Sequence, residues 1–474
     1  MMQIDTIFKA FKTRKYNYVY DRHANTVIRV NEDEFKEFQL LENGKISAEQ
    51  SIIIERYRDE DLFKKNTVIQ IEHPSTLIMK SYLTSRMKQL TLQVTQQCNL
   101  RCGYCAYSGI YQGQRTHSNK RMSLETAFKA IDFFLERNGE LSEVVIGFYG
   151  GEPLLEFELI KECVDYAKSM VEGKRIRFNM TTNGTLLSDD VVDYLSENDF
   201  DLSISLDGSK TEHDTNRKFA NGDGSFDLII SNVRRIADRY PEFVSKLSFL
   251  TTINPHIDID CTLEYFNTDE FFNDKTIIFN SMNEKSYKGE ISYDRNYYMI
   301  RNYEYIKMLF SLVGKLDSNH VSPLVNRAKD AIRRRQESID SRIPLGITAH
   351  PGGPCLAGVM RLFVRADGTL FPCERVSEMK DFFVIGTLDK GIDVDKIVHI
   401  MNIGKITETE CKNCWGLRQC ELCASQIEFD MIITKEDKIK ECSRCKNAAI
   451  ANLYELSVLR EFGYDSETVG MQQR

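Results

Sequence analysis

The cysteines of this chain are gathered in a few short segments, and this distribution constrains the fold more than any other feature of the sequence. Of the 13 cysteines in 474 residues, 11 lie in clusters. Three fall within eight residues, and eight more lie in the last 120 residues. Closely spaced thiols are typical of metal or iron–sulfur ligands, so we expect metal to organise both regions. Two cysteines stand apart and are expected to be small buried residues within helices: Cys163 and Cys261.

The rest of the sequence indicates the surroundings of these thiols. The N-terminal segment MMQIDTIFKAFKTRK lacks the apolar core and the small-residue cleavage site of a signal peptide. No stretch reaches the roughly 18 apolar residues that a membrane span needs. We therefore expect a cytoplasmic protein with no membrane partner, whose reduced thiols bind metal rather than form disulfides. The net charge of −8 argues against a nucleic-acid partner, which usually meets a basic face.

Between residues 86 and 285, β-prone runs alternate with helical segments. This pattern predicts an α/β fold with a parallel sheet, open or partly closed as a barrel, whose site lies at the carboxyl ends of the strands. The expected strands are Gln89–Thr95, Glu143–Tyr149, Arg175–Thr181, Phe200–Leu206, Lys246–Ile253 and Lys275–Phe279. The helices expected between them lie near 123–138, 156–172, 188–198, 225–240 and 258–272.

The first cysteine group follows directly on the first expected strand, in QVTQQCNLRCGYC. Cys98, Cys102 and Cys105 can hold three irons of a [4Fe–4S] cube and leave the fourth iron open, as catalytic metal sites do. A zinc or structural site is the alternative reading of these three residues. The spacing and its position after a strand resemble the signature of the radical SAM superfamily. That resemblance implies that the open iron chelates S-adenosylmethionine, and that reductive cleavage gives a 5′-deoxyadenosyl radical that abstracts a substrate hydrogen. It also implies that Tyr104 packs near the adenine.

Motifs at the later strand ends carry the same resemblance. Gly150, Gly151 and Glu152, in the sequence GGEP, resemble the motif that meets the amino group of S-adenosylmethionine. Glycines allow close backbone approach, and Glu152 offers an anionic acceptor. The resemblance further implies cofactor contacts at three positions, although the Asn-Gly and Asp-Gly pairs beside two of them are also ordinary turn formers: Asn183, Ser205 and Arg217.

The C-terminal cysteines are spaced too tightly for a zinc ribbon, which needs about 15–20 residues between its cysteine pairs. Their pattern resembles the SPASM domain, an extension of radical SAM enzymes that modify peptides, and implies two auxiliary [4Fe–4S] clusters. The sequence departs from that pattern in two places. Two residues rather than three separate Cys420 from Cys423, and Cys445 is an additional cysteine. The resemblance implies the second auxiliary cluster on Cys411, Cys414, Cys420 and Cys442. It also implies that the first auxiliary cluster is held by Cys355, Cys373 and Cys423, with Cys445 or a substrate thiolate as its fourth ligand. Three cubes, with one iron given to S-adenosylmethionine, use eleven thiolates, which favours Cys445 as a ligand.

Residues 1–85 predict a small α+β unit. The β-prone runs Tyr16–Tyr20 and Thr26–Val30 flank a turn at Arg22–Asn25, and Asn31 can cap a helix over Glu32–Leu41. A hairpin followed by helices resembles a winged helix–turn–helix, although an N-terminal embellishment without a partner is the alternative. The resulting division is 1–85 as a winged-helix-like leader-recognition element, 86–285 as a partial (β/α)6 radical SAM barrel, 286–345 as a helical connector, 346–450 as a SPASM domain and 451–474 as a tail.

This order of parts resembles maturases of ribosomally made peptides, closest to those that form thioethers in Cys-rich peptides. The resemblance implies a precursor peptide whose leader adds a strand to the N-terminal sheet. It also implies an external electron donor of flavodoxin or ferredoxin type. The expected reaction joins a cysteine sulfur to an unactivated carbon, with the auxiliary clusters accepting the surplus electron. The alternatives are a sulfatase-type maturase that makes formylglycine, a peptide maturase that makes carbon–carbon crosslinks or epimers, and a non-catalytic iron–sulfur electron carrier.

Overall fold

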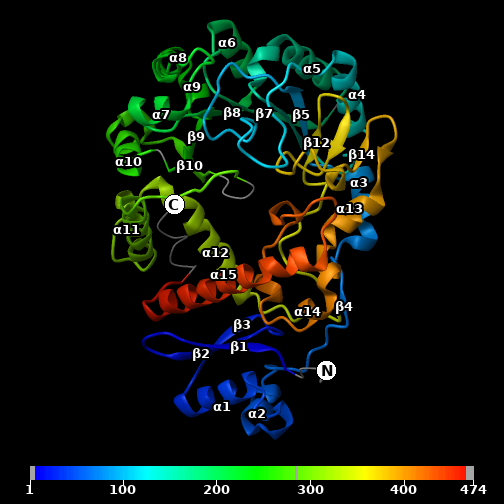
Figure 1. Cartoon of the computed structure of the whole chain (residues 1–474), viewed down its shortest axis with the longest axis vertical. Coiled ribbons are helices and arrows are strands. Elements are labelled where there is room, and N and C mark those ends of the chain that lie inside the picture. Colours follow the sequence, from blue (N-terminus) through cyan, green and yellow to red (C-terminus); the bar gives the residue numbers. More distant parts are fainter. Residues whose placement is uncertain (1–5, 172, 256, 283–286, 466–474) are drawn as a thin grey trace.

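A ten-stranded sheet forms the centre of the molecule in the computed structural model, which describes residues 6–171, 173–255, 257–282 and 287–465 (Figure 1). The strand order is β10-β9-β8-β7-β6-β5-β12-β13-β14-β15. Its first six strands run parallel, and each begins and ends within two residues of the expected bounds. They are β5 (Gln89–Thr95), β6 (Glu143–Gly150), β7 (Arg175–Thr182), β8 (Phe200–Ser205), β9 (Ser248–Ile253) and β10 (Thr276–Ser281).

Helices connect these strands and cover the outer side of the curved sheet (Figure 1). Most begin at a residue whose side chain can cap the free amide groups of the first turn, as where the hydroxyl of Ser123 accepts from the backbone N–H of Thr126. The expected alternation of strand and helix is confirmed, and so is the α/β class with a partial barrel. The expected helices are α4 (Leu124–Leu135), α5 (Phe157–Ser169), α6 (Asp189–Glu197), α8 (Phe226–Arg239) and α10 (Ile259–Thr268), and two short ones are added, α7 (Lys210–Asn216) and α9 (Pro241–Val244).

Aromatic side chains on neighbouring strands form part of the core of this sheet. Phe148, Phe178 and Phe200 are buried and stack with centroid distances of 5.4 to 6.4 Å. Phe178 and Phe200 are directly paired in register across β7 and β8. Such pairs fix the register of parallel strands, and the register in turn fixes where the carboxyl ends of the strands meet.

The Cys-rich C-terminal segment extends the same sheet. Leu362 of β12 pairs with Leu90 of β5 in parallel, and β13 to β15 follow as antiparallel strands. Phe363 and Phe371 are fully buried in the core that the sheet shares with its helices. The sequence did not predict this part of the core, because the strands of the segment are only two or three residues long and give no periodic signal. They are β12 (Leu362–Val364), β13 (Thr369–Phe371), β14 (Gly386–Thr387) and β15 (Gly391–Ile392).

The N-terminal residues fold as a three-stranded antiparallel sheet followed by two helices. The expected hairpin is present, and Asn31 caps the first helix in a capping box with Glu34. The first strand, β1, has no counterpart in the sequence prediction. Within the described residues the strand order is β1-β2-β3, so β1 and β3 are the edges. The elements are β1 (Phe8–Lys12), β2 (Asn17–Asp21), β3 (Thr26–Val30), α1 (Glu32–Glu42) and α2 (Ile52–Asp59).

A long helix, α15 (Lys435–Glu461), joins the C-terminal segment to the N-terminal sheet (Figure 1). Leu453 and Leu456 in its second half pack in one apolar cluster with Tyr18 of β2. The boundary expected at residue 450 falls inside this helix, and residues 466–474 of the expected tail lie outside the described residues. The other helices and strands are β4 (Gln70–Ile71), α3 (Met79–Ser85), α11 (Arg295–Leu312), α12 (Asn326–Asp340), β11 (Thr348–Ala349), α13 (Val394–Met401) and α14 (Glu408–Lys412). Among the described residues, no helix is both long and apolar enough to cross a membrane.

The two isolated cysteines differ in burial. Cys163 is buried in α5, as expected. Cys261 lies in α10 but is exposed, which corrects the expectation of a buried residue. The physical reason is its place in the first turn, beside Asp258 and Asp260, on the polar side of the helix.

Candidate active site

One cavity of about 200 Å³ lies at the carboxyl ends of β5 to β8. All residues that the sequence singled out as ligands of the first cluster or as cofactor contacts line it, although they are spread over 120 positions of the chain. The structure thus brings together Cys98, Cys102, Tyr104, Cys105, Gly150, Gly151, Glu152, Asn183, Ser205 and Arg217.

The loop after β5 folds its three thiols inward. The backbone N–H of Leu100 donates to Cys98 Sγ at 3.4 Å, and that of Tyr107 donates to Cys105 Sγ at 3.4 Å. Burial raises the pKa of Cys98 to about 11 and that of Cys102 to about 12. These thiols are therefore protonated on their own at neutral pH, and metal binding would release their protons.

The two glycines after β6 permit close packing of this loop. A Cβ on Gly150 would lie 2.0 Å from the carbonyl oxygen of Thr95, and a Cβ on Gly151 would lie 2.2 Å from that of Gln97. Gly150 also has a positive φ of 153°. Only glycine fits at either position, because the end of β6 rests directly on the backbone that leads into Cys98. The close approach predicted for these glycines is therefore an approach to the cysteine loop.

Glu152 joins the ends of β6 and β7. Its carboxylate accepts from the hydroxyl of Thr182 and the backbone N–H of Asn183, both at 2.7 Å, and from the backbone N–H of Leu154 at 3.1 Å. Burial raises the pKa of Glu152 to about 7, against the lowering effect of these bonds. Because this pKa lies near neutral pH, the Glu152 carboxyl on the wall of the cavity can become a carboxylate when a cationic group binds beside it.

Asn183 contacts the first cysteine of the loop. Its side-chain N–H donates to Cys98 Sγ at 3.9 Å and to the amide oxygen of Asn99 at 2.8 Å. Its own amide oxygen accepts from the backbone N–H of Thr185 at 3.0 Å. In this arrangement Asn183 holds the cysteine loop as well as lining the cavity.

The sequence prediction overlooked Asp207, which organises one wall of the cavity. Asp207 is fully buried and accepts from Arg217 Nε at 2.9 Å and from the hydroxyl of Tyr104. Burial disfavours the charge of Arg217, but the Asp207 carboxylate, together with Tyr104 and Cys102, outweighs that effect, so the pKa of Arg217 is raised. Asp207 stands in an Asp-Gly pair after a predicted strand, and the sequence offered only the reading of a turn.

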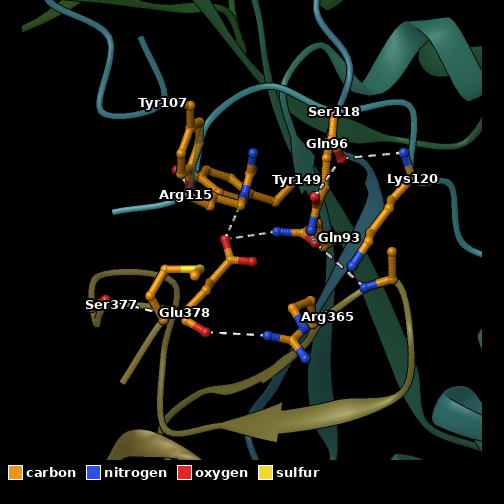
Figure 2. A network of polar contacts seen from close by, with 12 residues as sticks. Gln93, Gln96, Tyr107, Arg115, Ser118, Lys120, Tyr149, Arg365, Ser377 and Glu378 are labelled. Carbon is orange, nitrogen blue, oxygen red and sulfur yellow. Dashed lines mark hydrogen bonds and ion pairs between the residues drawn. The ribbon is translucent and has the colours of Figure 1, made fainter. Parts of the chain in front are cut away.

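A second overlooked network backs the opposite wall (Figure 2). Tyr107 and Tyr149 line the cavity, and the guanidinium of Arg115 lies 3.5 Å from the ring centroid of Tyr107. Arg115 Nε donates to the carboxylate of Glu378 at 2.8 Å, and the side-chain amide of Gln93 in β5 donates to the same oxygen at 2.8 Å. This buried ion pair joins the cysteine loop to the C-terminal segment, because Arg115 belongs to the former and Glu378 to the latter.

The C-terminal cysteines form two separate groups. The pKa of Cys373 is raised to about 11, chiefly by burial and also by the neighbouring charges of Glu374, Cys355 and Cys423. Cys355, Cys373 and Cys423 form the first group. The second lines a small pocket near α14 and the start of α15 and contains Cys411, Cys414, Cys420, Cys442 and Cys445.

The position of Cys445 corrects the expected division of ligands. A hydrogen bond between the thiols of Cys420 and Cys445 raises the pKa of Cys420 and lowers that of Cys445. Cys445 therefore lies in the second group, because it follows Cys442 by three residues on one face of α15. The first group keeps three cysteines and the second has five.

The donor sets of all three groups suit iron–sulfur clusters. All thirteen cysteines are free thiols. Within the part of the chain that the structure describes, no three Cys, His, Asp or Glu side chains are arranged to hold a single metal ion. A [4Fe–4S] cube takes cysteine thiolates as ligands to its irons.

Comparison with known proteins agrees with this geometry. Residues 92–263 match the family model of the radical SAM superfamily. That segment includes the first cysteine group and every other predicted residue of the cavity, so this part of the chain is a radical SAM domain.

Similarity to characterised relatives extends beyond this domain. The cysteine-type anaerobic sulfatase-maturating enzyme of Clostridium novyi (strain NT) is 27% identical over 354 residues, which are 69% of this chain and 86% of the relative. The radical SAM cyclopropyl synthase TigE of Paramaledivibacter caminithermalis is 25% identical over 253 residues, 51% of this chain and 50% of the relative.

Solved structures share the fold. Native anSMEcpe with bound AdoMet has a TM-score of 0.55 at 20% identity, covering 78% of this chain and 99% of that chain. The same protein with bound AdoMet and Kp18Cys peptide has a TM-score of 0.53 at 19% identity, covering 79% of this chain and 99% of that chain. The radical SAM fold is thereby confirmed for the main part of the molecule.

Proposed function

We propose that this chain is a radical SAM maturase that installs thioether bonds, from cysteine sulfur to carbon, in a Cys-rich precursor peptide. Similarity to an enzyme that matures sulfatases, and to a structure with a bound peptide, supports a peptide substrate. The observation that carries the thioether reaction is the first C-terminal group, Cys355, Cys373 and Cys423. Three thiols leave one iron of a cube without a protein ligand, and a substrate thiolate is the ligand that a thioether-forming enzyme must position.

The residues of the cavity have distinct roles in this proposal. Cys98, Cys102 and Cys105 hold a [4Fe–4S] cluster, and Asn183 steadies the first of them. Glu152 and Ser205 would bind the polar end of S-adenosylmethionine, and Tyr104, which contacts Asp207 and Arg217, would pack beside its adenine. When bound, this cofactor pair supplies a carbon radical that can remove hydrogen from an unactivated carbon. The ring wall of Tyr107, which is buried, and of Tyr149 and His117, which are half-buried, limits the access of water to that reaction.

The peripheral parts complete the proposed enzyme. The first and second C-terminal groups would hold two auxiliary [4Fe–4S] clusters, which would supply an acceptor for the electron left when the C–S bond forms. A leader peptide adds a strand to an edge of the N-terminal sheet, and the enzyme draws reducing electrons from a flavodoxin or ferredoxin in the cytoplasm.

Formylglycine formation is the second candidate, and the similarity to the sulfatase-maturating enzyme favours it. However, anSMEcpe is covered over 99% of its length, whereas 22% of this chain lies outside that match. A leader-binding unit would account for additional residues of this kind. Carbon–carbon crosslinking has a parallel in the cyclopropyl synthase, which matches only half of this chain.

Co-expression with a short Cys-rich peptide encoded beside the gene tests the proposal. A thioether product loses two hydrogens per bond and protects one thiol per bond from alkylation. The Cys98→Ala, Cys102→Ala, Cys105→Ala triple variant, which should keep auxiliary iron, is the matched control and must give unmodified peptide. A product in which one cysteine has lost its sulfur supports formylglycine instead, and an unchanged mass with every thiol alkylated refutes both.

A further inference from the structure

Two buried cations flank the five-cysteine group without a carboxylate partner. The side chain of Arg22 comes from the N-terminal sheet and that of Lys438 from α15; the two residues are 2% and 3% exposed. Among the described residues, no Asp or Glu oxygen lies within 4.0 Å of either cationic group.

Arg22 lies in the turn between β2 and β3 and reaches the C-terminal segment around Cys414. One of its terminal nitrogens, Nη1, donates to the backbone carbonyl oxygens of Lys412 at 2.7 Å and of Cys414 at 3.4 Å. The other, Nη2, donates to the side-chain oxygen of Asn66, while Nε has no hydrogen-bond partner. All of these acceptors are neutral. Burial lowers the pKa of Arg22 to about 10, so the guanidinium is still charged at neutral pH.

Lys438, in α15, contacts the same five-cysteine group. Its ammonium group donates to Cys411 Sγ at 3.5 Å and to the hydroxyl of Thr407, which itself lies 3.3 Å from that sulfur. The carboxylate that lines the pocket, Glu410, pairs with Lys435 instead. Asp21, the chain neighbour of Arg22, accepts from the backbone N–H groups of His23 and Phe63.

A buried charge without a counter-charge is strongly unfavourable, so this arrangement calls for an anion in the pocket. A [4Fe–4S] core of charge +2 held by four thiolates has a net charge of −2, which two cations balance. The five thiols are the source of that anion, because the pocket has no other group with an unpaired negative charge.

We propose that Arg22 and Lys438 are the counter-ions of the cluster held by the second C-terminal group and that they raise its reduction potential. Reduction adds one electron and one negative charge to the cluster, and a nearby fixed positive charge stabilises the reduced form. This inference rests on the part of the proposed function that assigns a cluster to these cysteines; it does not depend on the product made.

Through Arg22, the N-terminal unit contributes a positive charge to the surroundings of this cluster. Other contacts join the same turn to the C-terminal segment at Arg418 and Gln419, without adding charge at the thiols. The side-chain amide of Gln419 donates to the hydroxyl of Tyr20 at 3.4 Å and to Asn25 Oδ1 at 3.2 Å. Arg418 donates to the backbone carbonyls of His23 at 3.2 Å and Ile343 at 2.6 Å. Arg418 is thus a matched control, a second arginine in the same interface that does not contact the cysteines.

The test is an EPR-monitored reductive titration with dithionite of the anaerobically reconstituted full-length enzyme. The signal of this cluster is assigned by its loss in Cys414→Ala. We expect Arg22→Gln and Lys438→Gln each to lower the ratio of reduced to oxidised cluster at a fixed potential about tenfold, which is ~59 mV for a one-electron couple. Arg22→Lys should stay close to the parent, and Arg418→Gln should leave the midpoint unchanged.

Several outcomes overturn the inference. Unchanged midpoints in both glutamine variants do so, as does an equal shift in Arg418→Gln or the absence of a cluster at this group in the parent enzyme. If the glutamine variants lose the cluster altogether, its retention in Arg22→Lys supports the counter-ion role, and its loss there too refutes it. A peptide product other than a thioether would overturn the proposed function and leave this result untouched.

Discussion

Cys420 and Cys445 show how one residue can alter a ligand inventory. Eleven clustered thiols match the number that three cubes require when one iron is left to S-adenosylmethionine. The structure divides them as three, three and five, because the helical spacing of Cys442 and Cys445 directs both side chains to the same pocket. One thiol of the five is then in excess at a four-ligand cluster. Cys445 contacts Cys420, so it can take the place of that ligand.

We therefore expect Cys420→Ser and Cys445→Ser each to keep the iron content of the parent, because the other thiol of this contacting pair can take the place of the one removed. The double variant should lose about four irons per chain. Iron and sulfide analysis after anaerobic reconstitution measures this. Cys414→Ser, which removes a thiol outside the Cys420–Cys445 pair, is the control and should lose the same amount by itself. Loss of iron in Cys445→Ser alone would show that Cys445 is an obligatory ligand.

At the scale of elements, the end of β6 determines the shape of the cysteine loop. The backbone N–H of Gly151 donates to Thr95 at 3.1 Å, and that of Glu152 donates to Gln97 at 2.9 Å. These bonds continue the pairing of β5 and β6 past the last regular pair and carry it to the residue before Cys98. The glycines therefore act on the thiols through backbone packing.

Gly151→Ala should displace the loop, since the new Cβ would meet the carbonyl oxygen of Gln97, which belongs to the backbone and cannot rotate away. We expect a loss of roughly 1–3 kcal/mol in the free energy of unfolding and the loss of iron from the first cysteine group. Chemical denaturation and iron analysis measure the two effects. The control is Gly139→Ala, because a Cβ there has no neighbour within 4 Å. An unaffected Gly151→Ala variant would contradict the packing role.

Across the whole molecule, the C-terminal segment is built into the radical SAM sheet. It adds β12 beside β5, and Glu378 pairs with Arg115 behind the cavity (Figure 2). Both side chains are buried, at 6% and 4% exposure, and Glu378 also accepts from Gln93. The cysteine loop and the first C-terminal cysteine group are thus fixed relative to each other by one sheet and one buried ion pair.

Glu378→Ala should cost about 3–5 kcal/mol of folding free energy, because it leaves the Arg115 guanidinium buried and unpaired. Adding Arg115→Met to that variant should recover part of the loss, and a double-mutant cycle by urea unfolding measures the coupling. The exposed pair Lys129–Asp389 also joins the sheet helices to the C-terminal segment. Lys129→Met is therefore a matched control, with an expected loss of less than about 1 kcal/mol. Strict additivity of the two core substitutions would refute the coupling.

Local patterns in the sequence were sufficient to predict the radical SAM sheet and its cavity. The six parallel strands have five or more residues each and alternate with helices that have polar first turns, so period and capping define them without reference to the rest of the chain. The residues at their carboxyl ends, from Cys98 to Ser205, then had to meet, because parallel strands place those ends at one edge of a sheet, whereas Arg217 reaches the cavity from the end of α7. Relatives and the family model agree with that prediction.

The sequence by itself determined that this chain has a parallel sheet with thiols, glycines and an acidic residue gathered at one edge, since each of those signals is local. Only the tertiary structure decided which distant side chains oppose one another. Asp207 beside Arg217, Arg115 beside Glu378, Cys445 beside Cys420 and Arg22 beside Cys414 are contacts between segments that no periodicity links. These contacts form because burying an unpaired charge or polar group is unfavourable in free energy. Only the folded chain brings a partner close enough to compensate for it.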